Sequence, residues 1–243
     1  MKKTFYILTI FISIASCTSQ RNKIERINFT TDYKLNSRIE SELAKDSASW
    51  KYQVSASEYA TKGDYRNALI QWDLAMRSED RSLTKPQIDS INKIYKRLDA
   101  SDYIIQQAKK NQIVIINEAH HNSFHRLFTK SLLKELFTNG YKFIGFEAIS
   151  FKEDLDSLQN IRKYPIQKTG YYVKDPQFGN LIREAIEIGY NVFPYETTNE
   201  ESDGKSREID QAKNILKIID ENPNEKFVIH CGFDHVLEGT HKS

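Results

Sequence analysis

Four short apolar runs recur along the second half of the chain, and each ends at or near a glutamate or a histidine. The runs lie at residues 113–116, 143–146, 191–195 and 227–229. Amphipathic helical patterns follow three of them, so we predict parallel strands whose carboxyl ends meet at one end of a sheet. Open α/β sheets bind their ligands at that end. The pattern therefore predicts an α/β fold with a mostly parallel sheet, flanking helices and a site at the strand ends.

Helical periodicity separates the predicted strands. Residues 123–139 place large apolar side chains on one broad face, and Asn139 with Gly140 can form a left-handed C-cap. Further helices are predicted over residues 178–188 and 207–221. The α/β domain is expected to cover residues 111–243. Because no helical pattern follows the fourth run, either the chain is truncated at its C-terminus or another element completes the sheet.

A wholly helical pattern occupies residues 48–110. From Trp50 onward, small and aromatic residues on either side of Gly63 and Asp64 resemble one tetratricopeptide helix pair. Pro86 opens a further helix, with apolar residues at alternating spacings of three and four. One helix pair cannot bury its own apolar face. We therefore expect this unit to cap the α/β domain or, alternatively, to dock another protein.

The first residues have a pattern of their own. Lys2 and Lys3 precede an apolar stretch that is too short to span a bilayer, and residues 14–17 (Ile-Ala-Ser-Cys) resemble the lipobox of bacterial lipoproteins. We predict a lipoprotein signal peptide over residues 1–16 and lipidation of Cys17. The protein would then be anchored in the bacterial cell envelope, at the outer membrane if the organism has one. The alternative is an ordinary secretory signal with Cys17 incidental.

Composition and charge change this picture only slightly. The chain has 243 residues, of which 39% are hydrophobic, enough for one large core and a small accessory unit. Residues 17–47 are polar and weakly patterned, so we expect a tether. Removal of Lys2 and Lys3 takes the formal net charge from +2 to zero, which gives no reason to expect nucleic-acid binding. Lipidation of Cys17 would leave Cys231 unpaired, so no internal disulfide is expected.

Carboxylates and imidazoles at the strand ends are the candidate chemical groups. Glu118 and His120 lie two residues apart on an extended exit, so they would point the same way, as a carboxylate that orients an imidazole must. Glu147 and Glu196 each end an apolar strand. A charge there is costly unless it is paired, binds a metal or faces an open cleft. Arg207, at the start of the next helix, is an available ion-pair partner.

A second histidine cluster follows the fourth run. Gly232 permits a close approach of the backbone, and His230 and His235 would then both face the strand ends. We interpret Cys231 as a small buried side chain rather than a nucleophile, because no adjacent group ensures a thiolate. His125 is expected to pack along its helix.

The order of these motifs resembles the superfamily that joins erythromycin esterases, ChaN-like haem-binding lipoproteins and Tiki/TraB proteins. The matching residues are Glu118 and His120, Glu147, Tyr195 and Glu196, Arg207, Asn214, and Gly232 to His235. The resemblance covers residues 112–239 and implies an α/β fold with a cleft at the strand ends. Two features depart from the family: Asn117 stands where a glycine is common, and the C-terminal part of the esterase-like branch is absent.

The resemblance implies three different chemistries. In the esterase-like members, the position of His120 would act as general base on water, while those of Glu118, Glu147 and Glu196 would orient or polarise. In the Tiki-like members, similar Glu and His positions would bind a divalent metal. The ChaN-like members bind haem at the protein surface. Family membership alone does not choose among these activities.

Three hypotheses for function follow. The first is a lipid-anchored cell-envelope hydrolase of an ester or amide bond in a small-molecule or peptide substrate. Water would be activated by His120, with Arg207 stabilising negative charge, or by a divalent metal. The candidate metal ligands are Glu118, His120, Glu147, His230 and His235. The second is a lipoprotein that binds haem or another iron-containing ligand without turnover, through His230, His235, Tyr171 or Tyr172. The third is an adaptor whose helical unit recruits a protein partner.

Overall fold

The computed structural model describes residues 33–76, 82–149, 162–199 and 201–236. The predicted signal peptide, Cys17 and the first part of the predicted tether lie outside the described residues. No helix in the described part of the chain is long and apolar enough to cross a bilayer.

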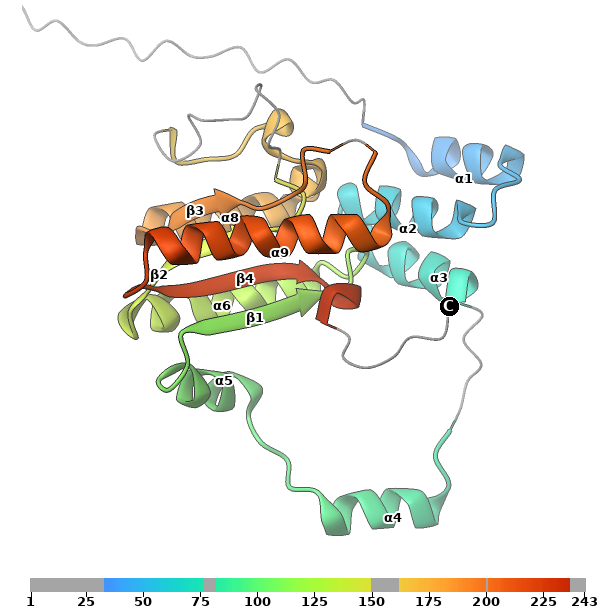
Figure 1. The fold of residues 1–243 in the computed structure, drawn as a ribbon. Helices are drawn as coiled ribbons and strands as arrows, with labels where there is room; N and C mark the ends of the chain where they lie inside the picture. The colour runs from blue at the N-terminus through green and yellow to red at the C-terminus, as the bar shows by residue number, and fades with distance from the viewer. Residues whose placement is uncertain (1–32, 77–81, 150–161, 200, 237–243) are drawn as a thin grey trace, which may run out of the picture.

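Four parallel strands form the sheet, which confirms the predicted α/β fold class. They are β1 (Ile113–Glu118), β2 (Tyr141–Phe146), β3 (Asn191–Pro194) and β4 (Lys226–Gly232). Their spatial order is β1-β4-β2-β3, so the last strand lies between the first two (Figure 1). In this register Glu118 pairs with Gly232, and Phe146 pairs with His230. The carboxyl ends of β1, β4 and β2 therefore lie next to one another.

Helices cover the two faces of the sheet. The helices α6 (Phe124–Thr138) and α8 (Pro176–Ile188) lie on one face and α9 (Gly204–Glu221) on the other (Figure 1). The α6 and α8 face contains the larger core, in which leucines, isoleucines and aromatic rings are fully buried. Burial of one such side chain contributes about 1.5 to 3 kcal/mol. This core fixes the helices against the sheet and thereby fixes the strand ends.

Both α8 and α9 begin earlier than the sequence pattern indicated, because acidic residues cap them. Asp175 precedes α8 and accepts hydrogen bonds from the backbone N–H groups of Gln177 and Phe178. Asp203 caps α9 in the same way, accepting from the N–H of Ser206. A carboxylate at this position satisfies an N–H group that has no partner within the helix.

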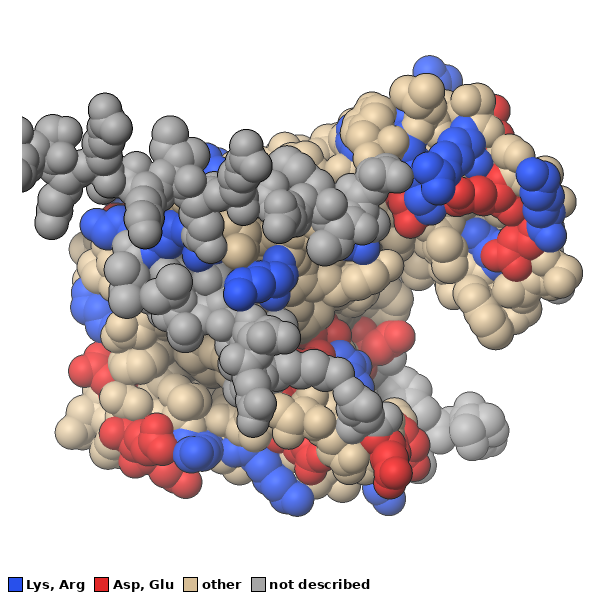
Figure 2. Space-filling view, turned by 90° about the horizontal axis from the view of Figure 1, so that it is seen from above, with Lys and Arg blue, Asp and Glu red and all other residues tan. Residues whose placement is uncertain are grey.

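The N-terminal part forms a helical unit beside the α/β body. It consists of α1 (Asn36–Lys45), α2 (Lys51–Thr61) and α3 (Tyr65–Met76). The turn between α2 and α3 contains Gly63 with a φ of 82°, which confirms the predicted turn. Seen from above, the unit is a separate lobe on which acidic and basic side chains are interspersed (Figure 2).

Helix α1 corrects the predicted tether, which was expected to continue to residue 47. Ile39 of α1 is only 2% exposed and packs in a small core with Tyr59, Ala60 and Ala68. The polar segment therefore folds as a helix because Ile39 packs against the apolar surface that α2 and α3 present. Residues 33–47 belong to the helical unit.

Two further helices follow. Helix α5 (Ala100–Ala108) buries Ile105 and Ala108 against the α/β core, whereas α4 (Lys85–Ile94) buries no residue. Figure 1 shows α4 apart from the rest of the molecule.

Candidate functional site

The carboxyl ends of β1, β2 and β4 border a cavity of about 390 Å³, which we call the strand-end cavity. His120 follows β1, Glu147 follows β2, and Gly232 ends β4. Phe233, Asp234 and His235 directly follow β4, and the other lining residues come from more distant elements: Trp72, Tyr172, Arg207 and Glu208. The structure thus brings five of the predicted site residues to one cavity: His120, Glu147, Tyr172, Arg207 and His235.

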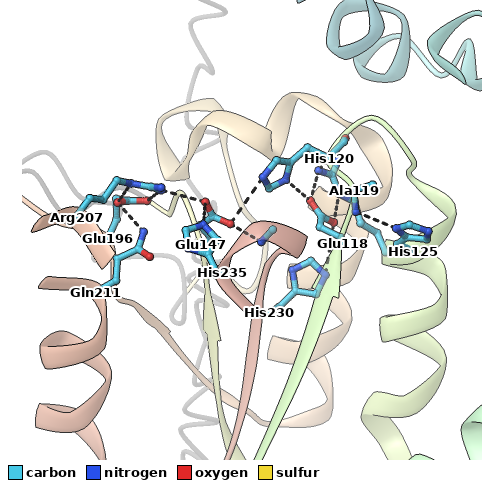
Figure 3. Close-up of polar contacts among 12 residues, drawn as sticks. Glu118, Ala119, His120, His125, Glu147, Glu196, Arg207, Gln211, His230 and His235 are labelled. Atoms are coloured by element: carbon cyan, nitrogen blue, oxygen red, sulfur yellow. Dashed lines mark hydrogen bonds and ion pairs between the residues drawn. The ribbon is translucent and has the colours of Figure 1, made fainter. Parts of the chain in front are cut away.

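His120 is held by a buried carboxylate. Its Nδ1 lies 2.8 Å from Oε1 of Glu118, whose side chain is 1% exposed (Figure 3). Arg126 from α6 fixes that carboxylate through two hydrogen bonds, Nε to Oε2 at 2.7 Å and Nη2 to Oε1 at 2.5 Å. Burial alone would raise the pKa of Glu118, but the charge of Arg126 and the hydrogen bonds from His120 and Arg126 hold it well below its usual range. Glu118 is therefore a permanent carboxylate.

The second nitrogen of His120 faces the cavity. The imidazole stacks on the ring of Tyr172, with centroids 4.2 Å apart and the planes 17° apart. Its Nε2 lies 3.8 Å from Oε2 of Glu147. A Cβ atom at Gly232 would lie only 2.7 Å from Nε2, so the ring can occupy this place because residue 232 is a glycine. The side chain of His120 is 29% exposed, which leaves it accessible to solvent.

Glu147 is the centre of a second group. Its Oε2 accepts a hydrogen bond from the backbone N–H of Gly232 at 2.6 Å, and its Oε1 lies 3.0 Å from Arg207 Nη2 and 2.9 Å from His235 Nε2. Burial raises the pKa of Glu147, but the hydrogen bond from His235, the nearby histidine charges and the Gly232 N–H outweigh it and bring the pKa to about 2. Glu147 therefore also remains ionised.

Glu196 and Arg207 form the ion pair that the sequence offered as one alternative. Arg207 donates from Nε to Oε1 at 2.8 Å and from Nη2 to Oε2 at 2.6 Å, and Gln211 donates to Oε1 at 2.9 Å (Figure 3). The hydrogen bond to Glu196 raises the pKa of Arg207 despite its partial burial. Through its contact with Glu147, Arg207 links Glu196 to the strand-end cavity.

His230 lies below the cavity and does not line it. The side chain is 1% exposed, and burial lowers its pKa to about 4, so the ring is neutral. Its Nε2 lies 3.5 Å from Oε2 of Glu118 but is not aligned for a hydrogen bond with it, and no other hydrogen-bond partner lies near this nitrogen among the described residues. The backbone carbonyl of His230 accepts hydrogen bonds from the Tyr195 hydroxyl and the Glu147 N–H. His230 therefore contributes to the packing of the strand ends.

Tyr171 and Tyr172, the other candidate haem ligands, lie in a short 3₁₀ turn (Tyr171–Lys174). Their rings meet edge to face, but only the Tyr171 ring, at 59%, is exposed. Cys231 is 4% exposed, and burial raises the pKa of its thiol to about 12. The interpretation of Cys231 as a small buried side chain is therefore confirmed.

The structure adds Arg126 and Asp175 to the residues that the sequence suggested. Arg126 is 1% exposed, and its Nη1 lies 3.1 Å from Asp175 Oδ2. Ser123 also donates a hydrogen bond to Asp175. No local signal singles out Arg126, since His125, Lys130 and Lys134 lie on the same predicted helix. Trp72 was also missed as a cavity residue.

A metal site does not fit the side chains as they stand. Among the residues that the structure describes, no three His, Cys, Asp or Glu side chains are arranged to hold a metal ion. The candidate ligands are bound to protein groups instead: Glu118 to Arg126, Glu147 to Arg207 and the Gly232 N–H, and both nitrogens of His235 to Glu147 and Glu208. We derive no chemical step through a metal.

The stability of the protein is expected to fall between pH 6.5 and 9. His235 Nδ1 lies 2.8 Å from Glu208, and its hydrogen bond to Glu147 is the main cause that raises the pKa of His235 to about 9. A raised pKa contributes stability that is complete below the unfolded value of about 6.5 and is lost as the pH rises through 9. The loss would be at most about 3 kcal/mol. Urea unfolding at pH 6.5, 7.5 and 9 measures it.

His235→Gln is the matched variant for that measurement, because glutamine keeps a polar side chain but has no titratable proton. Its stability should change less than that of the wild type over the same pH range. Parallel curves for the two proteins would contradict a protonated His235 in the folded state.

Comparisons with known proteins give only distant structural likenesses. No protein family and no curated protein matches the sequence. One similar solved structure is the type III effector HopBA1, at 14% identity over 54% of this chain and 71% of that chain, with a TM-score of 0.38. A second, titled bacterial protein toxins, has 14% identity over 81% of this chain and 44% of its own, with a TM-score of 0.47.

A third is the effector domain RRSP of a MARTX toxin from Vibrio vulnificus. It has 15% identity over 79% of this chain and 39% of that chain, with a TM-score of 0.44. The chain spans less than half the length of this structure and of the second one. Likenesses at this level do not indicate a function for this chain.

Proposed function

We propose that this protein hydrolyses an ester or amide bond, with His120 as the general base that activates water. The observation that carries the proposal is the position of the His120 ring. One nitrogen is bonded to the buried carboxylate of Glu118, and the other faces the strand-end cavity. A carboxylate that fixes the tautomer of an imidazole and stabilises its protonated form is the arrangement that general-base hydrolysis needs.

The steps follow from this geometry. With the Nδ1–H of His120 donating a hydrogen bond to Glu118, Nε2 has a free lone pair and takes a proton from water as the water oxygen attacks the substrate carbonyl. The imidazolium then returns that proton to the leaving alcohol or amine when the carbon–oxygen or carbon–nitrogen bond breaks. Tyr172 and Arg207 line the same cavity and can donate hydrogen bonds to the oxygen that becomes negative.

Water is the proposed nucleophile because the described cavity lining contains no serine, threonine or cysteine. Cys231 is buried, and its raised pKa keeps it a thiol. A covalent intermediate on a carboxylate of the described lining would use Glu147, Glu208 or Asp234. Glu147 is bonded to Arg207, His235 and the Gly232 N–H, and Glu208 is bonded to His235, so either would have to break these bonds before attacking. Direct attack by water requires no such rearrangement.

The cellular setting is proposed from the sequence. The lipobox resemblance at residues 14–17 supports anchoring in the cell envelope through Cys17, with a small molecule or a peptide as substrate. The adaptor alternative is supported by α4, where Ile88, Ile91 and Ile94 are all exposed. The membrane anchor and a protein partner are both compatible with the proposed hydrolysis, because neither uses the strand-end cavity.

A haem-binding function has weaker support. Of its four candidate ligands, His230 is buried, His235 is bonded at both nitrogens and Tyr172 stacks on His120. Tyr171 is the exposed one. A Soret band on titration with hemin, lost in Tyr171→Phe, would favour this function over hydrolysis.

The experiment that tests hydrolysis uses the full chain in detergent with a panel of esters and amides. Acid release is followed with and without a chelator. We expect turnover of at least one uncharged ester or amide, unchanged by the chelator, because the proposed base is a protein side chain. Absence of turnover across the panel would contradict the proposal. Turnover abolished by the chelator and restored by a divalent metal would favour the metal-assisted alternative.

A further inference from the structure

The helical unit meets the α/β body at the proposed catalytic loop. The indole of Trp72 in α3 stacks on the imidazole of His121, with centroids 3.8 Å apart and the planes 11° apart. His121 is 6% exposed and directly follows His120 in the chain. A residue from the N-terminal unit is therefore in ring contact with the residue next to the proposed base.

The helical unit also approaches His120 through α2. A small pocket of about 20 Å³ separates α2 from the α/β body. On the α2 side it is lined by Ser57, Glu58, Ala60 and Thr61, and across from them by His120, Arg126 and Tyr172 among others. A space of this size admits about one water molecule. The helical unit thus lies close against the catalytic loop along both α2 and α3.

Trp72 also lines the strand-end cavity itself. It shares this lining with the rings of His120, Tyr172 and Phe233, which together give the cavity an aromatic part. The remaining lining is charged, with carboxylates of Glu147, Glu208 and Asp234 and cations of Arg207 and His235. The cavity therefore has no excess of positive charge, and an anionic ligand would gain little there.

We propose that α3 supplies the substrate-binding wall of this cavity, and that Trp72 selects substrates with a flat, uncharged apolar group beside the bond to be broken. Indole faces bind flat rings in offset-stacked or edge-to-face arrangements. Because His121 stacks on the indole, Trp72 is fixed before the substrate enters, and a preorganised wall loses little side-chain entropy on binding. The helical unit is then part of the active site. This inference deepens the proposed hydrolase function and rests on it.

The two tryptophans of the chain allow a binding test without turnover. Trp50 is 60% exposed and does not line the cavity. Trp50→Phe leaves Trp72 as the only indole, and Trp72→Phe leaves Trp50. The probe is 4-nitrobenzyl alcohol, a flat uncharged nitroaromatic that quenches indole fluorescence on contact. We expect saturable quenching in Trp50→Phe and only linear, collisional quenching in Trp72→Phe. Linear quenching in both variants would overturn the proposal.

The activity test compares ethyl benzoate with ethyl acetate, each followed by acid release. In Trp72→Ala, the KM for ethyl benzoate should rise about tenfold, whereas the KM for ethyl acetate, which has no ring, should rise less. Trp50→Ala is the matched control and should leave both esters unaffected. Equal losses on both esters in Trp72→Ala, with kcat reduced, would show a merely structural role and overturn the proposal.

The two tests fail separately. If the wild type hydrolyses no ester or amide while Trp50→Phe shows saturable quenching, the hydrolase function fails and the Trp72 wall stands as a binding surface. If hydrolysis is found but quenching is linear in both variants, the wall fails and the function stands. Trp72→Phe keeps a ring in place, so a retained preference for ethyl benzoate in this variant supports a stacking role even if Trp72→Ala does not fold.

Discussion

Replacing His120 by alanine is expected to lower kcat of the proposed hydrolase by about 10²-fold to 10⁴-fold, the usual contribution of a general base. KM should change little, because the lost interaction acts on the attacking water in the transition state and not on the bound substrate. The side chain is 29% exposed, so its removal should cost about 1 kcal/mol or less of folding stability. Initial rates over a range of ester concentrations measure kcat and KM separately.

His120→Gln is the control for the shape of the site. Glutamine can still donate a hydrogen bond to Glu118, but it cannot accept and release a proton near neutral pH. It should therefore be as inactive as the alanine variant while unfolding at nearly the wild-type urea concentration. Wild-type kcat in either variant would show that His120 is not the base. A raised KM with unchanged kcat would assign it to substrate binding.

The convergence of distant side chains at the strand ends could be anticipated from sequence because it depends only on strand direction. Parallel strands end on the same side of a sheet whatever their spatial order. The order itself, with β4 between β1 and β2, did not follow from the apolar runs. That order nevertheless determines the site, since it places Gly232 between Glu118 and Glu147, where its N–H reaches the second carboxylate.

Two site residues could not be assigned from local patterns. Arg126 lies on α6, and periodicity gives the apolar face of a helix but not which polar neighbour turns inward. Its position depends on the buried carboxylates of Glu118 and Asp175, which come from β1 and from the N-terminus of α8. Trp72 reaches the cavity only because a whole helical unit packs beside the α/β body. Both positions depend on tertiary packing, so the sequence pattern of a single segment does not predict them.

The roles of the two strand-end histidines also separate only in three dimensions. His230 and His235 lie five positions apart and were expected to face the same place. His235 lies in the short helix after β4 and is hydrogen-bonded to Glu147. His230 lies within β4, and its ring contacts those of Phe146 and Phe178. Burial then makes one ring neutral and carboxylate contacts make the other positive. The same residue type is therefore neutral at one end of the motif and positively charged at the other.

Arg126→Met should be the most destabilising substitution at the site, with a loss of about 3 to 5 kcal/mol in the free energy of unfolding. Methionine keeps much of the volume between the rings of Tyr172 and Phe178, on which the guanidinium now lies. It removes, however, the positive charge that compensates Glu118 and Asp175, both nearly fully buried. Urea unfolding at pH 7 measures the loss.

Adding Glu118→Gln to Arg126→Met should restore part of that stability, because the double variant no longer buries the Glu118 charge without its partner. The double-mutant cycle then gives a coupling energy for this pair that exceeds that of an exposed salt bridge, which is usually below about 1 kcal/mol. The pH dependence of the stability of Arg126→Met is an independent test of the same ion pair. Without Arg126, burial raises the pKa of Glu118, so the single variant should regain stability relative to the wild type as the pH falls towards 5. A loss below about 1 kcal/mol at pH 7 would contradict a buried ion pair beneath His120.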